Sequence, residues 1–317
     1  MRAFLALASL ALAAADYKYF LTGNRENVSV RTQPGFFLAG GGRDVDDAWR
    51  WFLNKAGGGD IVILRASGAD GYHGFPQRLG VPVDSVESIV FLNREASSNA
   101  EVLRIINNAD ALFFAGGDQW NYVRFWKGTP VEDAIHAAVK RGIPIGGTSA
   151  GLAILGEFGF SAEKNTVTSK EALADPFHKK VTISRDFLRL PHLHCLITDS
   201  HFTQRVREGR LLVFMARIKR ESKCKTVRAI GIDERTAVLL EADGQSRVAG
   251  ENRAIFYDLS QTPKRIAPGR PAEIGGLHAC AVASNGAFGL KRWSGNSACR
   301  ESIAVRKGEI LRRITNE

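Results

Sequence analysis

The sequence predicts an α/β fold in which a doubly wound, mostly parallel sheet forms the middle of a three-layer sandwich, followed by a β-rich C-terminal extension. Short apolar runs alternate with segments of helical period from about residue 36 to residue 160. The run 111–115 is apolar throughout, which is typical of a central parallel strand covered on both faces. Several of these runs end in glycine-rich loops, and such folds bind ligands at the carboxyl ends of their strands.

The first strand-helix-strand unit lies between residues 36 and 64. We expect a strand at 36–39, a helix at 44–55 with Val45, Ala48, Trp49 and Phe52 on one face, and a strand at 60–64. Two parallel strands joined in this way imply a right-handed crossover. The glycines at 40–42 suit a nucleotide-binding loop as an alternative, but they lack both the G-x-G-x-x-G order and a P-loop Lys-Ser/Thr.

The alternation continues, and then the pattern changes. We expect strands near 88–92 and 111–115, helices at 98–107 and 131–141, and a strand at 143–145 before a glycine-rich turn. After a polar excursion at 159–180, extended segments at 187–190 and 195–197 lead to a helix whose buried face is Leu211, Phe214, Met215 and Ile218. A strand from 229 ends at a carboxylate, and short strands at 254–259 and 279–283 follow.

The N-terminus has the pattern of an export signal. Met1-Arg2 is a short positive region, residues 3–14 are rich in Ala and Leu, and small residues precede Asp16. The run is too short to span a bilayer, and no other stretch approaches about 18 uninterrupted apolar residues. We therefore expect cleavage near Ala15 and a periplasmic or extracellular protein without a membrane span; a buried N-terminal helix is the alternative.

The chain then divides into four segments. Residues 1–15 are the expected signal peptide, 16–33 an irregular, extended N-terminal arm, 34–245 the α/β domain and 246–317 the β-rich extension.

Charge and cysteine content narrow the function classes. The chain of 317 residues has 43 Lys and Arg against 33 Asp and Glu, a formal charge of +10. No recognition helix, RNP sequence or zinc-finger spacing is present, so a basic groove for a carboxylate-rich substrate is favoured over nucleic acid. The four cysteines of an exported chain suggest disulfides, with three possible pairings, of which Cys280–Cys299 is the simplest; four buried thiols are the alternative. No C-x-x-C occurs, so we expect no metal.

Residues 147–151, Gly-Thr-Ser-Ala-Gly, fit G-x-S-x-G, the sharp strand-to-helix turn that exposes a serine nucleophile. A strained turn needs small neighbours so that a substrate carbonyl can approach Ser149. The N–H of Ala150 then faces the developing oxyanion at a helix N-terminus. An ordinary glycine-rich turn with a capping serine is the alternative.

A serine nucleophile needs a base and a group that orients the base. His201 is the best base because it follows a strand, opens a helix and precedes several arginines, and Glu234 is the best orienter because it ends a strand. An α/β-hydrolase would have the order Ser, acid, His, and His278 keeps that reading open. His192 and His194 alternate on an expected strand and so share a face, but no third metal ligand accompanies them, which favours structural roles.

Arginines cluster at the start of the predicted helix that follows His201. Arg205, Arg207 and Arg210 lie in its expected first turns, where cations are unfavourable unless an anion binds. An anion site explains this placement; a solvated basic face is the alternative.

Four ordered blocks strongly resemble the cyanophycinase-like serine peptidases, a group related to the aspartyl dipeptidases. The blocks are residues 113–119 (FFAGGDQ), 147–151 (GTSAG), 199–202 (DSHF) with Arg205, Arg207, Gly209 and Arg210, and 231–237 (GIDERTA). The resemblance covers about residues 36–240. It implies a class I glutamine amidotransferase-like sandwich in which a serine replaces the usual cysteine nucleophile.

The resemblance also assigns roles. It makes Ser149 the nucleophile, His201 the base and Glu234 the orienter. It places the oxyanion donors at Gly116, Gly117 and Ala150, and the substrate pocket at Gln119, Asp199, Arg205, Arg207 and Arg210. Cyanophycinases resemble Asp-Gln-His-Phe in the third block, whereas this chain has Ser200, which cannot make the contacts of a glutamine amide.

We therefore expect an exported serine exopeptidase that hydrolyses aspartyl or isopeptide amide bonds of a peptide or cyanophycin-like substrate, without a cofactor. The alternatives are another acyl hydrolase, such as an esterase or amidase, and a binding module that does not catalyse. A glutamine amidotransferase is disfavoured because residue 149 is not a cysteine. A homodimer is expected by family resemblance alone.

Overall fold

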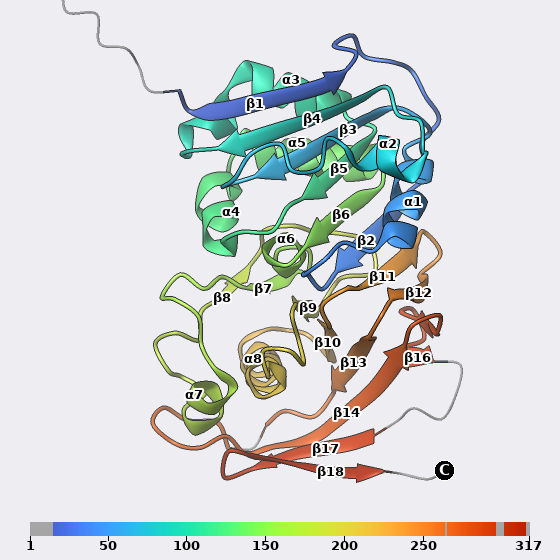
Figure 1. Cartoon of the computed structure of the whole chain (residues 1–317). Coiled ribbons are helices and arrows are strands. Elements are labelled where there is room, and N and C mark those ends of the chain that lie inside the picture. The colour runs from blue at the N-terminus through green and yellow to red at the C-terminus, as the bar shows by residue number, and fades with distance from the viewer. Residues whose placement is uncertain (1–14, 264, 296–300, 315–317) are drawn as a thin grey trace, which may run out of the picture.

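Two β-sheets follow one another along the molecule (Figure 1). The computed structural model describes residues 15–263, 265–295 and 301–314. The first sheet has the order β1-β4-β3-β5-β6-β2-β11-β12-β15-β16. Its five strands from β4 to β2 are parallel, and the remaining pairs are antiparallel. The bounds are β1 Tyr17–Gly23, β2 Gly35–Ala39, β3 Asp60–Arg65, β4 Ser85–Phe91, β5 Ala111–Phe114, β6 Ile145–Thr148, β11 Thr236–Glu241, β12 Gln245–Gly250, β15 Ala287–Gly289 and β16 Ser294–Gly295.

The second sheet has the order β18-β17-β14-β13-β10-β9-β7-β8. Its pairs are antiparallel except β7–β9 and β9–β10. The bounds are β7 Phe158–Phe160, β8 Ile183–Arg185, β9 Leu196–Asp199, β10 Val227–Ile232, β13 Arg253–Leu259, β14 Ile274–Ala283, β17 Glu301–Arg306 and β18 Glu309–Ile314. The chain passes from the second sheet to the first between β10 and β11.

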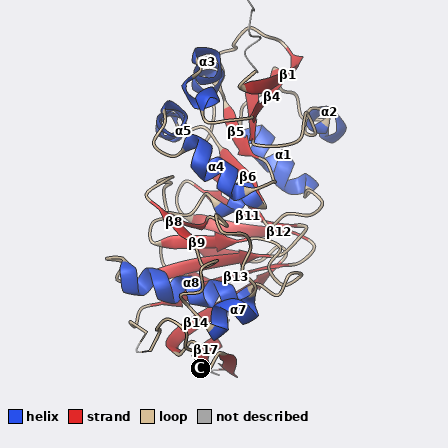
Figure 2. Cartoon of the chain, turned by 90° about the vertical axis from the view of Figure 1, so that its left-hand side faces the viewer, coloured by secondary structure: helices blue, strands red, loops and turns tan. Residues whose placement is uncertain are grey.

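Helices cover both faces of the first sheet, as a doubly wound sandwich requires (Figure 2). On one side lie α1 (Asp46–Lys55) and α2 (Phe75–Leu79), and on the other lie α3 (Ala100–Asn108), α4 (Gln119–Trp126) and α5 (Pro130–Arg141). A short α6 (Ala150–Ala153) follows β6, and a 3₁₀ turn spans Glu95–Ser98. Next to the second sheet lie α7 (Ser169–Ala174) and α8 (Glu208–Glu221).

Among the residues that the structure describes, three apolar cores hold these layers together. One lies under α1, around Phe37, Trp49 and Phe113. A second fills the opposite face of the first sheet and continues to β9, β10 and β13, so that it joins the two sheets. The third lies between α8 and the second sheet. The predicted fold class, a mixed α/β sandwich with a parallel central sheet and further β structure, is confirmed.

The predicted elements of the first sheet agree with the structure to within a few residues. The helices expected at 44–55 and 131–141 are α1 and α5. The strand expected at 143–145 lies two or more residues later, because the extended chain continues through Gly146 and Gly147 as β6. The periodicity did not indicate α2, α4 or α7, which are short.

Three expectations were wrong. The first part of the N-terminal arm is not irregular, because residues 17–23 pair with β4 as the edge strand β1, whereas residues 24–34 form no helix or strand. The helix after His201 starts only at Glu208, so Arg205 precedes it and Arg207 is its N-cap. His192 and His194 lie in turns before β9, not on one strand face.

The adjacent strands β5, β6 and β2 place their carboxyl ends at one edge of the first sheet. The loops that begin at Gly40, Gly116 and Ser149 therefore lie side by side, as expected. The strands that follow residue 245 belong to both sheets: β12, β15 and β16 extend the first, and β13, β14, β17 and β18 extend the second.

A disulfide joins Cys195, just before β9, to Cys224, just before β10. Cys280 is also disulfide-bonded, and Cys299, its expected partner, lies outside the described residues. So do residues 1–14 of the expected signal peptide. Across the part of the chain that the structure describes, no helix combines the length and apolar character needed to cross a membrane.

Candidate active site

Ser149 lies on a sharp turn between β6 and α6. Its φ of 53° and ψ of −111° are uncommon for a residue with a side chain, and such strain is often found at functional sites. The first and last glycines of the motif leave no room for a side chain. A Cβ on Gly147 would lie 2.7 Å from the Gly151 backbone, and one on Gly151 would lie 2.0 Å from the Phe114 carbonyl oxygen. The local sequence therefore permits the turn that presents the serine hydroxyl.

The three predicted catalytic side chains form one hydrogen-bonded series. Ser149 Oγ lies 2.7 Å from His201 Nε2, and His201 Nδ1 lies 2.6 Å from Glu234 Oε1. His201 follows β9, and Glu234 lies where the chain passes from β10 to β11. The first sheet thus supplies the serine, and the second sheet supplies the histidine and the glutamate.

The imidazole of His201 is almost enclosed. Its side chain is 9% exposed, whereas that of Glu234 is 31% exposed. Burial lowers the pKa of His201 below its ordinary value of 6.5, although the hydrogen bond to Glu234 acts in the opposite direction. The same hydrogen bond lowers the pKa of Glu234. At neutral pH the site therefore holds a neutral imidazole, which can accept a proton, beside a carboxylate.

The glycines at 40–42 pack against His201 and Glu234, a role that the sequence did not lead us to predict. A Cβ on Gly41 would lie 2.6 Å from Cε1 and Nε2 of His201, and one on Gly42 would lie 3.1 Å from Cβ of Glu234. The Gly40 carbonyl accepts the His201 N–H at 2.7 Å, and the Gly41 carbonyl accepts the Arg235 N–H at 2.8 Å. Consecutive glycines at the predicted catalytic edge were the available signal.

The predicted oxyanion loop lies against the serine. A Cβ on Gly116 would be 3.6 Å from Cβ of Ser149, and Gly117 has a φ of 147°. Ala150 is the first residue of α6, where the N–H groups at a helix start have no partner inside the helix. Gly116 thus lies beside the nucleophile and Ala150 follows it in the chain; that the backbone N–H groups of Gly116, Gly117 and Ala150 bind an oxyanion stays a prediction.

A pocket of about 660 Å³ begins at this loop, and Gly117, Asp118, Gln119, Glu163, Arg205, Arg207 and Arg210 are among the residues that line it. Gln119 donates to the Phe160 carbonyl at 3.2 Å. Arg205 is exposed. Burial lowers the pKa of Arg207 to about 10, so this guanidinium stays charged at neutral pH. The pocket therefore offers cationic groups next to the predicted oxyanion loop.

Asp199 and Arg210, which we predicted at the substrate pocket, are paired with each other, and Arg210 lines the pocket. Arg210 Nε and NH2 donate to the two carboxylate oxygens of Asp199 at 2.7 and 2.6 Å, and both side chains are at most 5% exposed. Arg207 adds bonds to Asp199 at 3.3 Å and to the Ser200 carbonyl at 2.9 Å. Asp199 thus holds two arginines in the pocket wall, and Arg205 remains the exposed cation.

The other candidate histidines lie elsewhere. His192 bonds to the Ala242 carbonyl and His194 to Glu157, which agrees with structural roles. His278 lies within β14, and the observed order Ser, His, Glu differs from that of an α/β-hydrolase. In the described part of the chain, Glu157, Cys195 and Cys224 lie close enough together to hold a metal ion, but the cysteines are joined as a disulfide.

Comparison with known proteins places this site in a family. Residues 77–248 match the model of peptidase family S51, which is more than half of the chain. A cyanophycinase of Synechococcus elongatus is 30% identical over 65% of this chain and 62% of its own length. One of Trichormus variabilis is 28% identical over 56% of this chain and 55% of its own length. The chain thus spans less than two thirds of the length of these relatives.

A solved structure extends the similarity to most of the fold. A peptidase from an acI-B1 actinobacterium superposes with a TM-score of 0.55 at 14% identity, and the match covers 82% of this chain and 98% of that one. At this identity the similarity supports the fold alone. The family match includes Ser149, His201 and Glu234, and on that match the chain belongs to peptidase family S51.

Proposed function

We propose that this protein is an exported serine exopeptidase that hydrolyses aspartyl or isopeptide-type amide bonds. The observation that carries the proposal is the series Ser149–His201–Glu234, with contacts of 2.7 and 2.6 Å on a strained serine turn. The cyanophycinase relatives and the family match support a peptide substrate. No step requires a cofactor.

The proposed reaction proceeds through an acyl-enzyme. Ser149 Oγ attacks the amide carbonyl while His201 Nε2 accepts the hydroxyl proton, and Glu234 stabilises the imidazolium that forms. The oxyanion is bound by N–H groups of Ala150 and the Gly116–Gly117 loop. His201 then gives its proton to the leaving amine as the C–N bond breaks. Water, activated by the same histidine, hydrolyses the ester and restores the serine.

The pocket supports a substrate that carries a carboxylate. Arg205 is exposed at the pocket and Arg207 lines it, and arginine pairs well with carboxylates. Ser200 Oγ is buried and accepts a bond from Arg207 at 3.2 Å. Ser200 therefore does not replace the glutamine that cyanophycinases have at this position. We propose that the arginines make the contacts to the substrate instead. We propose an acidic dipeptide or a similar short substrate, with a leaving group other than that of cyanophycin.

The proposal of export has support from the disulfide. A bond such as Cys195–Cys224 persists mainly in oxidising compartments. Fractionation of the source cells, with N-terminal sequencing of the recovered protein, tests both export and a start near Asp16. Recovery from the cytoplasm with an intact N-terminus would contradict it.

The activity is tested with purified protein and a Ser149→Ala variant. Both are incubated with cyanophycin, with aspartyl and isoaspartyl dipeptides and with simple esters, and the released amine or alcohol is followed. We expect turnover of the acidic dipeptides that disappears in the variant. Turnover of simple esters alone would favour the esterase alternative, and tight binding without turnover would favour a binding module.

A further inference from the structure

Two loops of the site are tied to one another crosswise. The base loop, residues 201–207, carries His201, and the orienter loop, residues 233–235, carries Glu234. Asp233 Oδ1 accepts the N–H of Thr203 at 2.9 Å, and Gln204 Oε1 accepts the N–H of Glu234 at 3.0 Å. In each loop, a residue close to the catalytic one thus uses its side chain to accept a main-chain N–H of the other loop.

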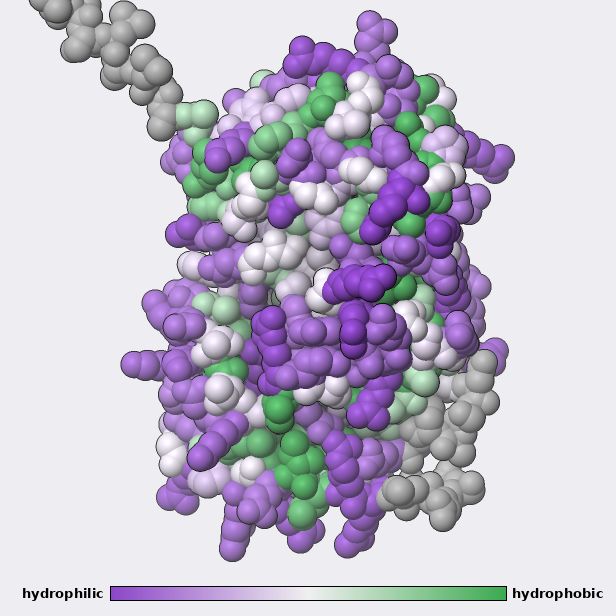
Figure 3. All heavy atoms as spheres, in the orientation of Figure 1, coloured by the Kyte–Doolittle hydropathy of each residue, from purple (hydrophilic) through white to green (hydrophobic). Residues whose placement is uncertain are grey.

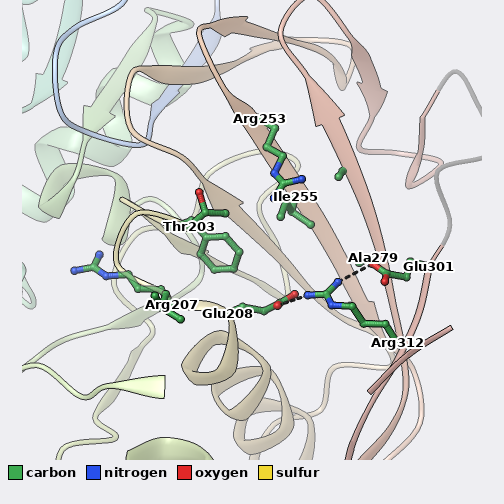
Figure 4. A pocket seen from close by; sticks show the side chains of 11 residues that line it. Thr203, Arg207, Glu208, Arg253, Ile255, Ala279, Glu301 and Arg312 are labelled. Carbon is green, nitrogen blue, oxygen red and sulfur yellow. Dashed lines mark hydrogen bonds and ion pairs between the residues drawn. The ribbon is translucent and has the colours of Figure 1, made fainter. Parts of the chain in front are cut away.

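The base loop is anchored at its start by the buried Phe202, but its outer part, residues 203–206, has little packing of its own. Residues 203–206 are exposed, and Val206 is 75% exposed at a φ of 49°. Behind the loop lies a pocket of about 540 Å³, whose walls include Thr203 and Val206 on the loop and Arg253 and Ile255 on β13 (Figure 4). The space-filling view shows this face as largely hydrophilic, with an apolar strip low on it (Figure 3). Hydrogen bonds rather than apolar packing must therefore hold this side of the loop.

Asp233 is a buried carboxylate, which destabilises the fold unless it is hydrogen-bonded. Its side chain is 4% exposed, and its ion pair in the described part of the chain is with Arg253, whose Nε lies 3.9 Å away, beyond hydrogen-bonding distance. A buried carboxylate is unfavourable unless it is bonded, and the described hydrogen bond to its side chain comes from the Thr203 N–H. That bond lies two residues from the catalytic imidazole.

The imidazole has little freedom to move. Its two ring nitrogens hold contacts of 2.7 and 2.6 Å in opposite directions, and His201 itself has a φ of 45°. A displacement of about 1 Å breaks one contact, and misplacement of that size costs about a hundredfold in rate. The position of the base loop relative to the orienter loop therefore controls the series.

We propose that Asp233 and Gln204 are positioning residues that keep His201 in line between Ser149 and Glu234. This inference rests on the proposed function of Ser149. The two residues act through the loops and do not contact the reacting atoms. Asp233 carries the larger share because it is buried, and Gln204 the smaller share because it is exposed.

The test uses the rate at which an organofluorophosphonate probe labels Ser149, measured over pH, together with thermal unfolding. In the Asp233→Ala variant the probe should react with Ser149 ten- to a hundredfold more slowly than in the wild type. The Asp233→Asn variant should keep most of the wild-type labelling rate, because its amide oxygen still accepts the Thr203 N–H. As the Glu234 contact weakens, the acid limb should move to lower pH. Gln204→Met should show a smaller loss of the same kind without unfolding, which keeps the test open if Asp233→Ala fails to fold.

Asp110→Ala is the matched control. Asp110 Oδ2 accepts the Asp60 N–H at 2.9 Å, a bond of the same type at the opposite edge of the first sheet. This variant should lose stability and keep its labelling rate and pH profile. In a Glu234→Ala background, Asp233→Ala should cause little further loss. Equal rates for Asp233→Ala and wild type, or equal losses for Asp233→Ala and Asp233→Asn, would overturn the inference.

A second readout separates this inference from the proposed function. The imidazole proton shared by His201 and Glu234 should give a far-downfield resonance by NMR, whether or not the protein hydrolyses peptides. Loss of this resonance in Asp233→Ala but not in Asp110→Ala supports positioning even if no peptidase activity is found. Its persistence in Asp233→Ala would refute positioning, and wild-type protein that fails to react with the probe would count against the proposed function instead.

Discussion

Gly41→Ala tests the claim that the glycines at 40–42 exist to admit the catalytic base. The new Cβ would lie 2.6 Å from two atoms of the His201 ring, while ordinary contact begins at 3.4 Å. The ring or the loop must therefore move by roughly 0.8 Å, and a misplacement of about 1 Å costs about a hundredfold in rate. The φ of 95° adds backbone strain of about 1–3 kcal/mol.

Gly58→Ala separates the two effects. Gly58 has a similar φ of 86°, but the nearest atom to its added Cβ is 3.8 Å away. Both variants should therefore lose a comparable amount of stability in thermal unfolding, and only Gly41→Ala should lose about a hundredfold in the rate of Ser149 labelling by a fluorophosphonate. Labelling of Gly41→Ala at the wild-type rate, or an equal loss in both variants, would refute the steric argument.

Four further predictions concern the base, the pocket and the disulfide. Burial lowers the pKa of His201 below 6.5, so the neutral base persists and labelling should stay near its maximum as pH falls through 6.5; a limb centred above that value contradicts this. Because the pKa of His201 is lower in the folded protein, its contribution to the free energy of unfolding is complete above pH 6.5 and is lost as pH falls below 6.5 through the folded pKa. A His201→Gln variant should lack this part of the pH dependence of unfolding. Arg205→Ala should raise KM for acidic dipeptides roughly three- to tenfold with little change in kcat, and KM for a neutral amide should not change. Replacing Cys195 and Cys224 together by alanine should cost roughly 3–4 kcal/mol by calorimetry, given a separation of 29 residues, while labelling of the folded protein persists.

The fold and the three central side chains could be predicted because their signals are local. Alternating apolar runs report strands and helices directly. The turn around Ser149 needs glycine at fixed positions, so its sequence is recognisable without the structure. His201 and Glu234 follow β9 and β10, and because these strands are parallel neighbours their carboxyl ends lie together.

The pairing of charged groups could not be predicted. Asp199, Arg207 and Arg210 all suit a carboxylate-binding pocket by residue type, and the sequence does not show which of them face one another. In the structure Asp199 accepts bonds from both arginines, so Asp199 and Arg210 are largely occupied, while the bonds of Arg207 use only its Nη1. Pairing across 8 and 11 residues depends on the loop before α8, whose residues have no periodic pattern.

The site's position between the sheets explains why strands far along the chain contribute to it. Glu234 lies at the passage from β10 to β11, and each of these strands pairs with a later one, β13 and β12 respectively. The turn between those later strands carries Asn252, whose amide donates to the Glu234 carbonyl at 2.8 Å. A residue of the predicted C-terminal extension therefore helps to fix the orienter. The extension therefore stabilises the loop that carries Glu234, because β12 and β13 pair with the two strands that flank this loop.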